Sequence, residues 1–226
     1  MSEQPHYLGH RKRLKKRILE AGFDGMHEYE LLELLLGYAI PRRDTKPLAK
    51  QLIQQFEGLG GVLNAPQDEL QKISGIGEHS AVLVKLLRGI YAYCLSEKLA
   101  HRIPLTSVHT VVEFAQAKLA YLSYEAFMVV YLNTQNEVLA HEIIHEGTID
   151  HALIYPRRVA ESALRRNAAS IILVHNHPSG HPRPSEADSQ ITRVLTKAMK
   201  LLDINVIDHI IVGRAGYFSF AEKGIL

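Results

Sequence analysis

His175 and His177 stand one residue apart at the end of an apolar, β-branched segment at 170–174. Side chains repeat every second residue along a strand, so the two imidazoles should leave the strand end on one face and converge. Proline and glycine residues then interrupt the chain, and Ser185 begins a segment with helical apolar periodicity, which puts Asp188 in the first helical turn. Two neutral imidazoles and one carboxylate are the ligand set of a catalytic zinc ion with one open coordination position.

The same residues also allow a purely structural interpretation. Ser185 followed three positions later by Asp188 has the spacing of a capping box, in which both side chains serve the helix N-terminus. Two histidines at strand spacing beside glycine and proline favour the metal site. Cys94 is the single cysteine of the chain, so a thiolate zinc cluster is excluded and the metal must be held by histidine and carboxylate.

The complete pattern resembles a known family signature. His175-x-His177, seven residues, Ser185, two residues and Asp188 match the H-x-H-x(7)-S-x(2)-D pattern of the JAMM (MPN-plus) metalloprotease-like domain. The sequence His-Asn-His-Pro-Ser-Gly, together with the downstream pair Asp208-His209, resembles the RadC branch, also called UPF0758. The resemblance extends over nearly the whole chain. It implies zinc as the cofactor, the two histidines and Asp188 as its ligands, and Ser185 as a hydrogen-bonding partner of the polarised carbonyl.

This resemblance implies a zinc-dependent hydrolase that cleaves a peptide or isopeptide bond in an unknown protein substrate. A zinc ion with an open position lowers the pKa of its water to about 7, and a proton shuttle is then still required. In the family the shuttle is an upstream glutamate, and Glu125 resembles that position. Glu142 and Glu146 on the next predicted strand remain open alternatives, and Asp208-His209 is interpreted as a structural pair.

Two other classes of function compete with the hydrolase. The letters His-Asn-His suggest a metal-dependent nuclease, but the nuclease motif of that name spreads its residues over a hairpin and a helix, whereas these histidines share one strand end. A zinc deaminase would need a Pro-Cys-x-x-Cys element, which the sequence lacks. A DNA- or protein-binding adaptor with a non-catalytic metal site remains the non-enzymatic alternative.

The N-terminal part of the chain has helical patterns throughout. A strongly apolar helix is expected at 28–37, stopped by Gly37, and another helix at 80–95. Between them, residues 70–84 resemble a helix-hairpin-helix whose turn is Gly75-Ile76-Gly77. Glycines let the backbone approach a phosphate closely, and the N–H groups at the start of the next helix form an anion site. DNA is therefore the predicted partner of this region, and a simple link between helices or a protein-binding hairpin are the alternatives that the same turn allows.

A basic cluster precedes these helices. Six of seven consecutive positions carry Lys or Arg, and Lys12 and Arg13 within this cluster are the candidate phosphate contacts. A solvated helix face balanced by nearby acidic residues explains the cluster equally well. The net charge of the whole chain is only +2, so the local cluster carries this argument and the total charge does not.

With 226 residues the chain is long enough for two small domains. A polar stretch at 96–104 predicts the boundary, giving a helical domain at 1–100 and a second domain at 104–226. In the second domain strands alternate with helices and a hairpin lies at each end, which predicts an α/β fold with a mixed sheet. No leader pattern or spanning apolar run is present, so we expect a cytoplasmic protein without a membrane partner.

Overall fold

The computed structural model describes residues 6–100, 108–147 and 155–226. It divides into two compact units, Met1–Ile90 and Tyr91–Leu226, which we describe separately. The division falls inside the helix Glu78–Ala100. The polar stretch at 96–104 is predicted to be a linker, but its first residues, 96–100, continue this helix. The domain limits 1–100 and 104–226 stay a prediction.

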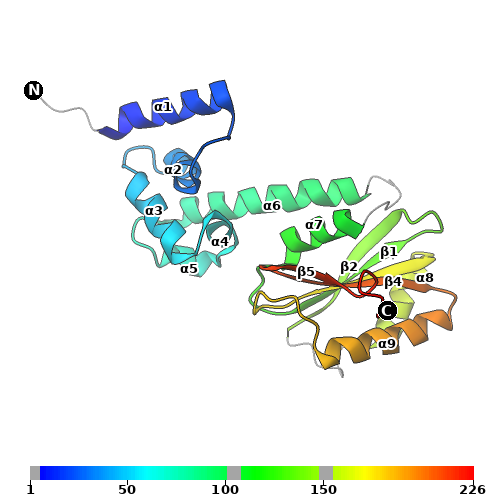
Figure 1. Cartoon of the computed structure of the whole chain (residues 1–226). Coiled ribbons are helices and arrows are strands. Elements are labelled where there is room, and N and C mark those ends of the chain that lie inside the picture. Colours follow the sequence, from blue (N-terminus) through cyan, green and yellow to red (C-terminus); the bar gives the residue numbers. More distant parts are fainter. Residues whose placement is uncertain (1–5, 101–107, 148–154) are drawn as a thin grey trace, which may run out of the picture. The chain divides into compact units, whose positions relative to one another are not determined.

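The N-terminal unit is built from helices, as predicted (Figure 1). Its elements are α1 (His6–Ala21), α2 (Glu28–Ala39), α3 (Lys46–Gln55), α4 (Leu59–Asn64), α5 (Gln67–Gln71) and the start of α6 (Glu78–Ala100). Leu32, Leu52, Val62 and Leu70, each from a different helix, are buried in one hydrophobic core. Among the helices of the described residues, none has the length and apolarity that crossing a membrane requires.

Two details of this unit differ from the sequence predictions. Gly37 does not stop α2, which ends at Ala39, where the N–H of Ile40 closes the last turn on the carbonyl of Leu36. The glycine-rich segment at 57–61 is typical of a link between helices, but α4 begins there at Leu59, because burial of Val62 in the core outweighs the low helix propensity of the neighbouring glycines.

The basic cluster of α1 is partly structural. The guanidinium of Arg11 donates hydrogen bonds to the carbonyls of Ile40 (3.0 Å), Pro41 (2.7 Å) and Arg43 in the loop after α2. A guanidinium suits this position because its donors form a planar fork. Arg11 therefore fixes the α2–α3 loop and is not available as a phosphate contact.

The C-terminal unit is an α/β domain. In chain order it contains α7 (Val108–Leu119), β1 (Ala126–Leu132), β2 (Val138–Glu146), α8 (Pro156–Arg165), β3 (Ser170–Asn176), α9 (Glu186–Lys200), β4 (Asn205–Gly213) and β5 (Gly216–Ser219). The sheet order is β2-β1-β3-β4-β5, in which β3 and β4 are parallel and the other neighbours are antiparallel. The predicted mixed sheet is confirmed. Ser107, the expected cap of α7, lies outside the described residues.

Helices cover both faces of this sheet. Val111, Phe114 and Ala115 of α7 pack with β-strand side chains such as Met128 on one face. On the other face, α8 and α9 pack against the alternate strand residues, among them Phe127, Ile171 and Leu173. Strand β3 is flanked on both sides by strands, and all seven of its residues are buried. The end of β3 is therefore a rigid support for the residues that follow.

Candidate metal centre

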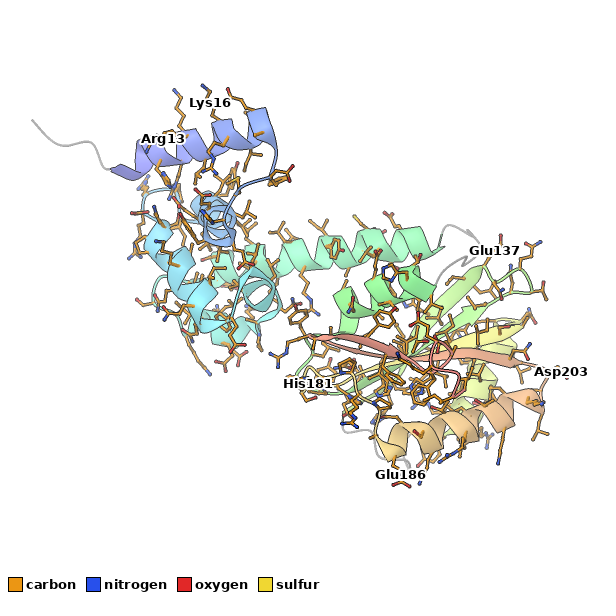
Figure 2. The ribbon with its side chains drawn as sticks, viewed as in Figure 1. Arg13, Lys16, Glu137, His181, Glu186 and Asp203 are labelled. Carbon is orange, nitrogen blue, oxygen red and sulfur yellow. The ribbon has the colours of Figure 1, made fainter. Side chains whose placement is uncertain are left out.

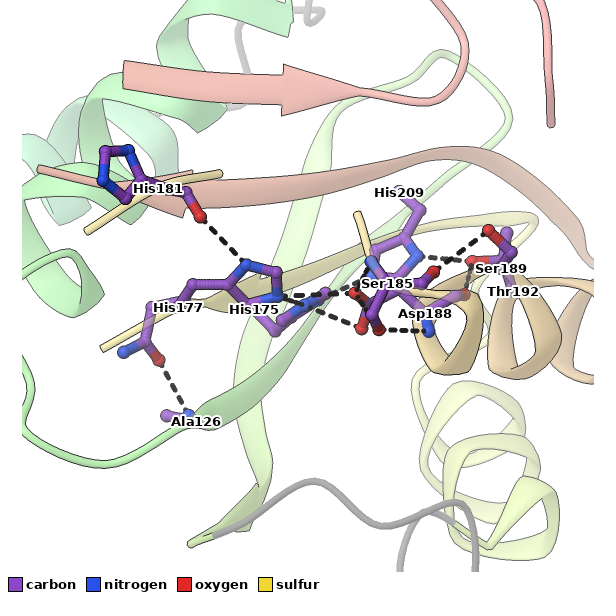
Figure 3. A network of polar contacts seen from close by, with 10 residues as sticks. Ala126, His175, His177, His181, Ser185, Asp188, Ser189, Thr192 and His209 are labelled. Carbon is purple, nitrogen blue, oxygen red and sulfur yellow. Dashed lines mark hydrogen bonds and ion pairs between the residues drawn. The ribbon is translucent and has the colours of Figure 1, made fainter. Parts of the chain in front are cut away.

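The two histidines and Asp188 meet at the end of β3 (Figure 3). His175 is the penultimate residue of the strand and lies between Phe127 of β1 and Ile211 of β4. It shares the strand parity of Ile171 and Leu173, so its ring is on the face covered by α9. Asp188 lies in the first turn of α9, as expected. Ligand atoms of the three residues all lie within 4.8 Å of one another.

The distances between these atoms fit a tetrahedral ion. Nε2 of His175 is 3.0 Å from Nε2 of His177 and 3.1 Å from Oδ1 of Asp188, and Nε2 of His177 is 3.4 Å from Oδ2 of Asp188. Two ligand atoms bound to zinc at about 2.0–2.1 Å with tetrahedral geometry are separated by about 3.3 Å. The donor set and its spacing therefore suit a zinc ion held by three protein ligands.

Burial and charge also suit a cation. His175 and Asp188 are buried and His177 is half-buried, so the cluster opens to solvent on the side of His177. Burial alone would raise the pKa of Asp188, but hydrogen bonds from the two histidines hold it far below its ordinary value. The hydrogen bond to Asp188 is the main cause of the raised pKa of His177, and the charge of Glu125 adds to it. The site thus keeps one anionic ligand under all ordinary conditions.

The capping box and the ligand role of Asp188 coexist. Ser185 is the N-cap of α9, and both its N–H (2.7 Å) and its hydroxyl (2.6 Å) donate to Oδ2 of Asp188. Oδ2 therefore serves both the helix start and His177, while Oδ1 faces His175. The predicted contact of Ser185 with a substrate carbonyl stays a prediction, since here its hydroxyl orients the carboxylate.

A tight loop orients His177. Its Nδ1 donates to the carbonyl of His181 (3.0 Å), so Nε2 is the ring nitrogen that faces Asp188 and that a metal ion would bind. The loop is closed by a bond from Gly180 N to the carbonyl of His177 (2.9 Å), and the N–H of Ala215 donates to the carbonyl of Gly180 (2.9 Å). Gly180 has φ +85°, a conformation that favours glycine.

The pair Asp208-His209 is buried beside the site. Asp208 accepts hydrogen bonds from Ser219 Oγ (2.6 Å), the N–H of His209 (2.7 Å) and the N–H of Ala221 (3.0 Å), which tie β4 to the segment that ends the sheet. Burial raises the pKa of Asp208. Burial also lowers the pKa of His209 well below its ordinary value, so this imidazole is neutral.

Glu125 lies immediately before β1, and its charge contributes to the raised pKa of His177. Its neighbours in the chain are fixed by Asn176, whose Oδ1 accepts from the N–H of Ala126 (2.7 Å) and whose Nδ2 donates to the carbonyl of Tyr124 (2.9 Å). The carbonyl of Glu125 accepts from the N–H of Gly147 (2.8 Å). Asn176 therefore places the backbone of Glu125 beside the residue that separates the two histidines.

The other two glutamates are placed differently. Glu142 lies opposite Val129 in the sheet, and its carboxylate is held by the hydroxyl of Ser162 in α8 and by Arg166 (3.0 Å) at the end of that helix. Glu146 lies opposite Ala126 at the correct end of the sheet, is exposed, and accepts a hydrogen bond from Tyr124 Oη (3.4 Å). The geometry thus disfavours Glu142 as the proton shuttle and leaves Glu146 as the competitor of Glu125.

Two residues around the cluster were not singled out by the sequence. Asn176 lies between the two histidines of the His-Asn-His segment. Because side chains alternate along a strand, its position predicts that it points away from the two imidazoles. Thr192 is four residues after Asp188, on the same face of α9, and its hydroxyl lies 2.5 Å from both the Asp188 carbonyl and the His209 ring. Helical spacing alone indicates the first of these contacts.

The candidate nucleic-acid residues belong to the N-terminal unit. Gly75 has φ +101°, as expected for the tight turn. The side chain of Ile76 is buried in the helical core, its N–H donates to the carbonyl of Ile73 (3.0 Å), and the N–H of Gly77 donates to Ser80 Oγ (3.2 Å). These two amides are therefore already satisfied within the hairpin.

The remaining basic residues of α1 have different environments. Arg17 pairs with Glu30 at 2.8 Å, Lys16 pairs with Glu20 at 3.5 Å, and Lys15 lies over the ring of Tyr38. The side chains of Lys12 and Arg13 are exposed, and Figure 2 shows Arg13 on the outer side of α1. These two residues stay the candidate phosphate contacts of the cluster.

Comparison with known families agrees with both units. The RadC-like JAB domain model matches residues 105–225, which include all three clustered ligands and Glu125. The UPF0758 N-terminal model matches residues 7–82, from α1 to the start of α6. The first match alone covers more than half of the 226 residues. The chain therefore belongs to the RadC-like JAB domain family.

Proposed function

We propose that this protein is a zinc-dependent hydrolase of the JAMM type that cleaves a peptide or isopeptide bond. The observation that carries the proposal is the convergence of His175, His177 and Asp188 at tetrahedral ligand spacing, with Glu125 beside the half-buried histidine. A JAB-type domain is compatible with such an activity. Three protein ligands leave a fourth position open, which is typical of catalytic zinc and not of structural zinc.

The residues of the chain have separable tasks in this proposal. A bound zinc ion would supply Lewis acidity, polarising the substrate carbonyl and acidifying a water molecule. Glu125 accepts the proton of the attacking water and delivers it to the leaving nitrogen, which requires it to lie within hydrogen-bonding reach of both. Asn176 holds the backbone of Glu125 on both sides. The hydroxyl of Ser185 donates its single proton to Asp188 in the free protein, and it would donate to the carbonyl oxygen of the substrate after turning from the carboxylate.

The first test is chelator-sensitive cleavage by the full-length protein. We would incubate it with isopeptide-linked and C-terminally extended small proteins, beside single-stranded and double-stranded DNA, before and after removal of metal. Peptide-bond cleavage that disappears with the chelator and returns with added zinc is the expected result, because a bound zinc ion would polarise the carbonyl and acidify the attacking water.

The other outcomes assign the competing functions. Cleavage of DNA that depends on metal in the same way would replace the hydrolase with a nuclease. Zinc binding without cleavage of any substrate in the panel, together with tight binding of one of them, would favour the adaptor with a non-catalytic metal site.

We also propose that the N-terminal unit contacts nucleic-acid backbone. The supporting observations are the exposed side chains of Lys12 and Arg13 and the left-handed conformation of Gly75, which precedes the first turn of α6. Such contacts are independent of base sequence and weaken with salt, because each neutralised phosphate releases bound counterions. The N–H groups of Ile76 and Gly77 already donate within the hairpin. In this proposal the phosphate therefore contacts the hairpin only at Gly75 and at the start of α6.

This second proposal predicts weak DNA binding by the full-length protein, with an affinity that falls steeply as salt increases. Lys12→Glu combined with Arg13→Glu should reduce both the affinity and the salt slope, the slope by roughly 2 because two phosphate contacts are lost. Lys200→Glu with Lys223→Glu, an equal charge change on exposed positions of the other unit, is the matched control. Equal loss in both double variants would show that only net charge matters.

A further inference from the structure

The ring of His175 has a partner on each side. Its Nε2 faces the other ligand atoms, and its Nδ1 lies 2.8 Å from Nε2 of His209. On the far side of that second ring, Nδ1 of His209 lies 2.5 Å from Thr192 Oγ1, which lies 2.5 Å from the backbone carbonyl of Asp188. His175, Thr192 and His209 are all buried, so water does not substitute for these partners. The chain of contacts is drawn in Figure 3.

The positions of the protons in this chain follow from counting donors. The Asp188 carbonyl can only accept, so the single hydroxyl proton of Thr192 points at it. Thr192 Oγ1 must then accept from His209, which places a proton on Nδ1 of His209. A neutral imidazole with a proton on Nδ1 carries a lone pair on Nε2, and this lone pair accepts from Nδ1 of His175. The other ring nitrogen of His175, Nε2, faces Oδ1 of Asp188 at 3.1 Å and is the nitrogen that a metal ion would bind.

We propose that His209, oriented by Thr192, is a positioning residue that keeps the proton of His175 on Nδ1 and so presents the Nε2 lone pair to the metal. The inference rests on the metal site of the proposed function and goes beyond it, because neither residue touches the ion or the substrate. We call the hydrogen-bonded chain from His175 through His209 to Thr192 the relay. It joins three separate elements, because His175 is on β3, His209 on β4 and Thr192 on α9. Outer partners of this kind raise ligand basicity and fix ring orientation.

The direction of the relay makes Thr192 as important as His209. Without the hydroxyl, Nδ1 of His209 would have no acceptor, and the buried ring would move its proton to Nε2 and donate to His175. His175 would then accept on Nδ1 and carry its proton on Nε2, the atom that the metal needs. Thr192→Val, which has nearly the same shape, should therefore impair zinc binding although position 192 is not a ligand.

The first experiment measures zinc affinity by competition with a chelator, with zinc alone as the probe. His209→Phe keeps a ring between Phe127 and Phe220, which the native ring contacts at centroid distances of 5.8 and 5.0 Å, but offers His175 no acceptor. We expect zinc affinity to fall about 10- to 100-fold in His209→Phe and in Thr192→Val. His209→Gln, whose amide oxygen can reach Nδ1 of His175, should recover part of the loss.

The second experiment reads the protons directly and does not need the metal. In the zinc-free protein, nitrogen NMR of the imidazole rings should show His209 neutral with its proton on Nδ1, and His175 with a proton on Nδ1. Thr192→Val should lose this pattern. A purely structural role would lower the melting temperature of the zinc-free variants without changing these signals or being rescued by glutamine.

Several outcomes would overturn the inference. A proton on Nε2 of His209 in the native protein would reverse the relay, and native zinc affinity in His209→Phe or Thr192→Val would show that the relay does not prepare the ligand. Absence of zinc binding in the native protein would instead refute the proposed function, and the NMR result would still decide whether His209 sets the proton of His175. The two failures are therefore distinguishable.

Discussion

Replacing Asp188 with alanine should lower bound zinc from about one ion per chain to a residual level and abolish hydrolysis. Asp188 is the anionic member of the cluster, and its pKa is held far below the ordinary value, so it supplies charge that two neutral imidazoles cannot. Elemental analysis after zinc loading and desalting measures the loss beside the native protein. His177→Ala should behave in the same way.

The controls for this change separate the metal from the helix. Asp188→Asn keeps an oxygen that can accept from Ser185 at the helix start but removes the charge, so it should keep the cap of α9 and still lose zinc. Glu186→Ala removes an acidic residue of the same helical turn and should keep native zinc content. Native zinc content in Asp188→Ala would refute the ligand assignment.

Replacing Glu125 with glutamine should leave fold and zinc content intact and reduce turnover roughly 10²-fold or more, the usual scale for a general acid-base group. Glutamine has the same size and can keep the position fixed by Asn176, but it cannot accept and return a proton. Turnover on the substrate found in the cleavage panel, with zinc content measured on the same sample, gives the result.

Two matched variants test the choice of glutamate. Glu146→Gln changes the exposed residue at the same end of the sheet, and Glu142→Gln changes the one held by Arg166, so both should keep most of the native turnover. Full activity in Glu125→Gln with a large loss in Glu146→Gln would transfer the shuttle to Glu146. The zinc mechanism would then stand with a different base.

The cluster of His175, His177 and Asp188 could be predicted because its signals are local. Strand parity relates His175 to His177, and the serine and acidic residue of a helix start fix Asp188 within one turn. The α/β class followed from the alternation of periodicities, and the all-helical first unit from its uninterrupted helical patterns. Each of these inferences uses residues that are close in the sequence, which a single sequence can relate.

The supporting contacts could not be predicted because they join distant segments. The bond between His175 and His209 spans 34 positions, and the bonds from Asn176 to Tyr124 and Ala126 span about 50. They depend on β3 lying between β1 and β4, an order that periodicity does not give. The preference for Glu125 over Glu142 likewise depends on the pairing register of β1 and β2, which places Glu142 opposite Val129. Gly37 failed as a stop signal because packing of α2 outweighed local propensity.

The carboxylate of Asp188 both caps α9 and belongs to the candidate metal site, so metal binding depends on the local opening of this helix end. Its Oδ2 holds the N-terminus of α9 through Ser185, while Oδ1 faces His175 on a strand buried between two others. Helix ends open locally at far lower free energy than central strands do. Transient unwinding of the first turn of α9 would remove the anionic ligand while both imidazoles stay in place. We therefore expect metal to enter and leave when the first turn of α9 opens locally. The contacts of Ser185 with Asp188 should then set the rate of metal exchange.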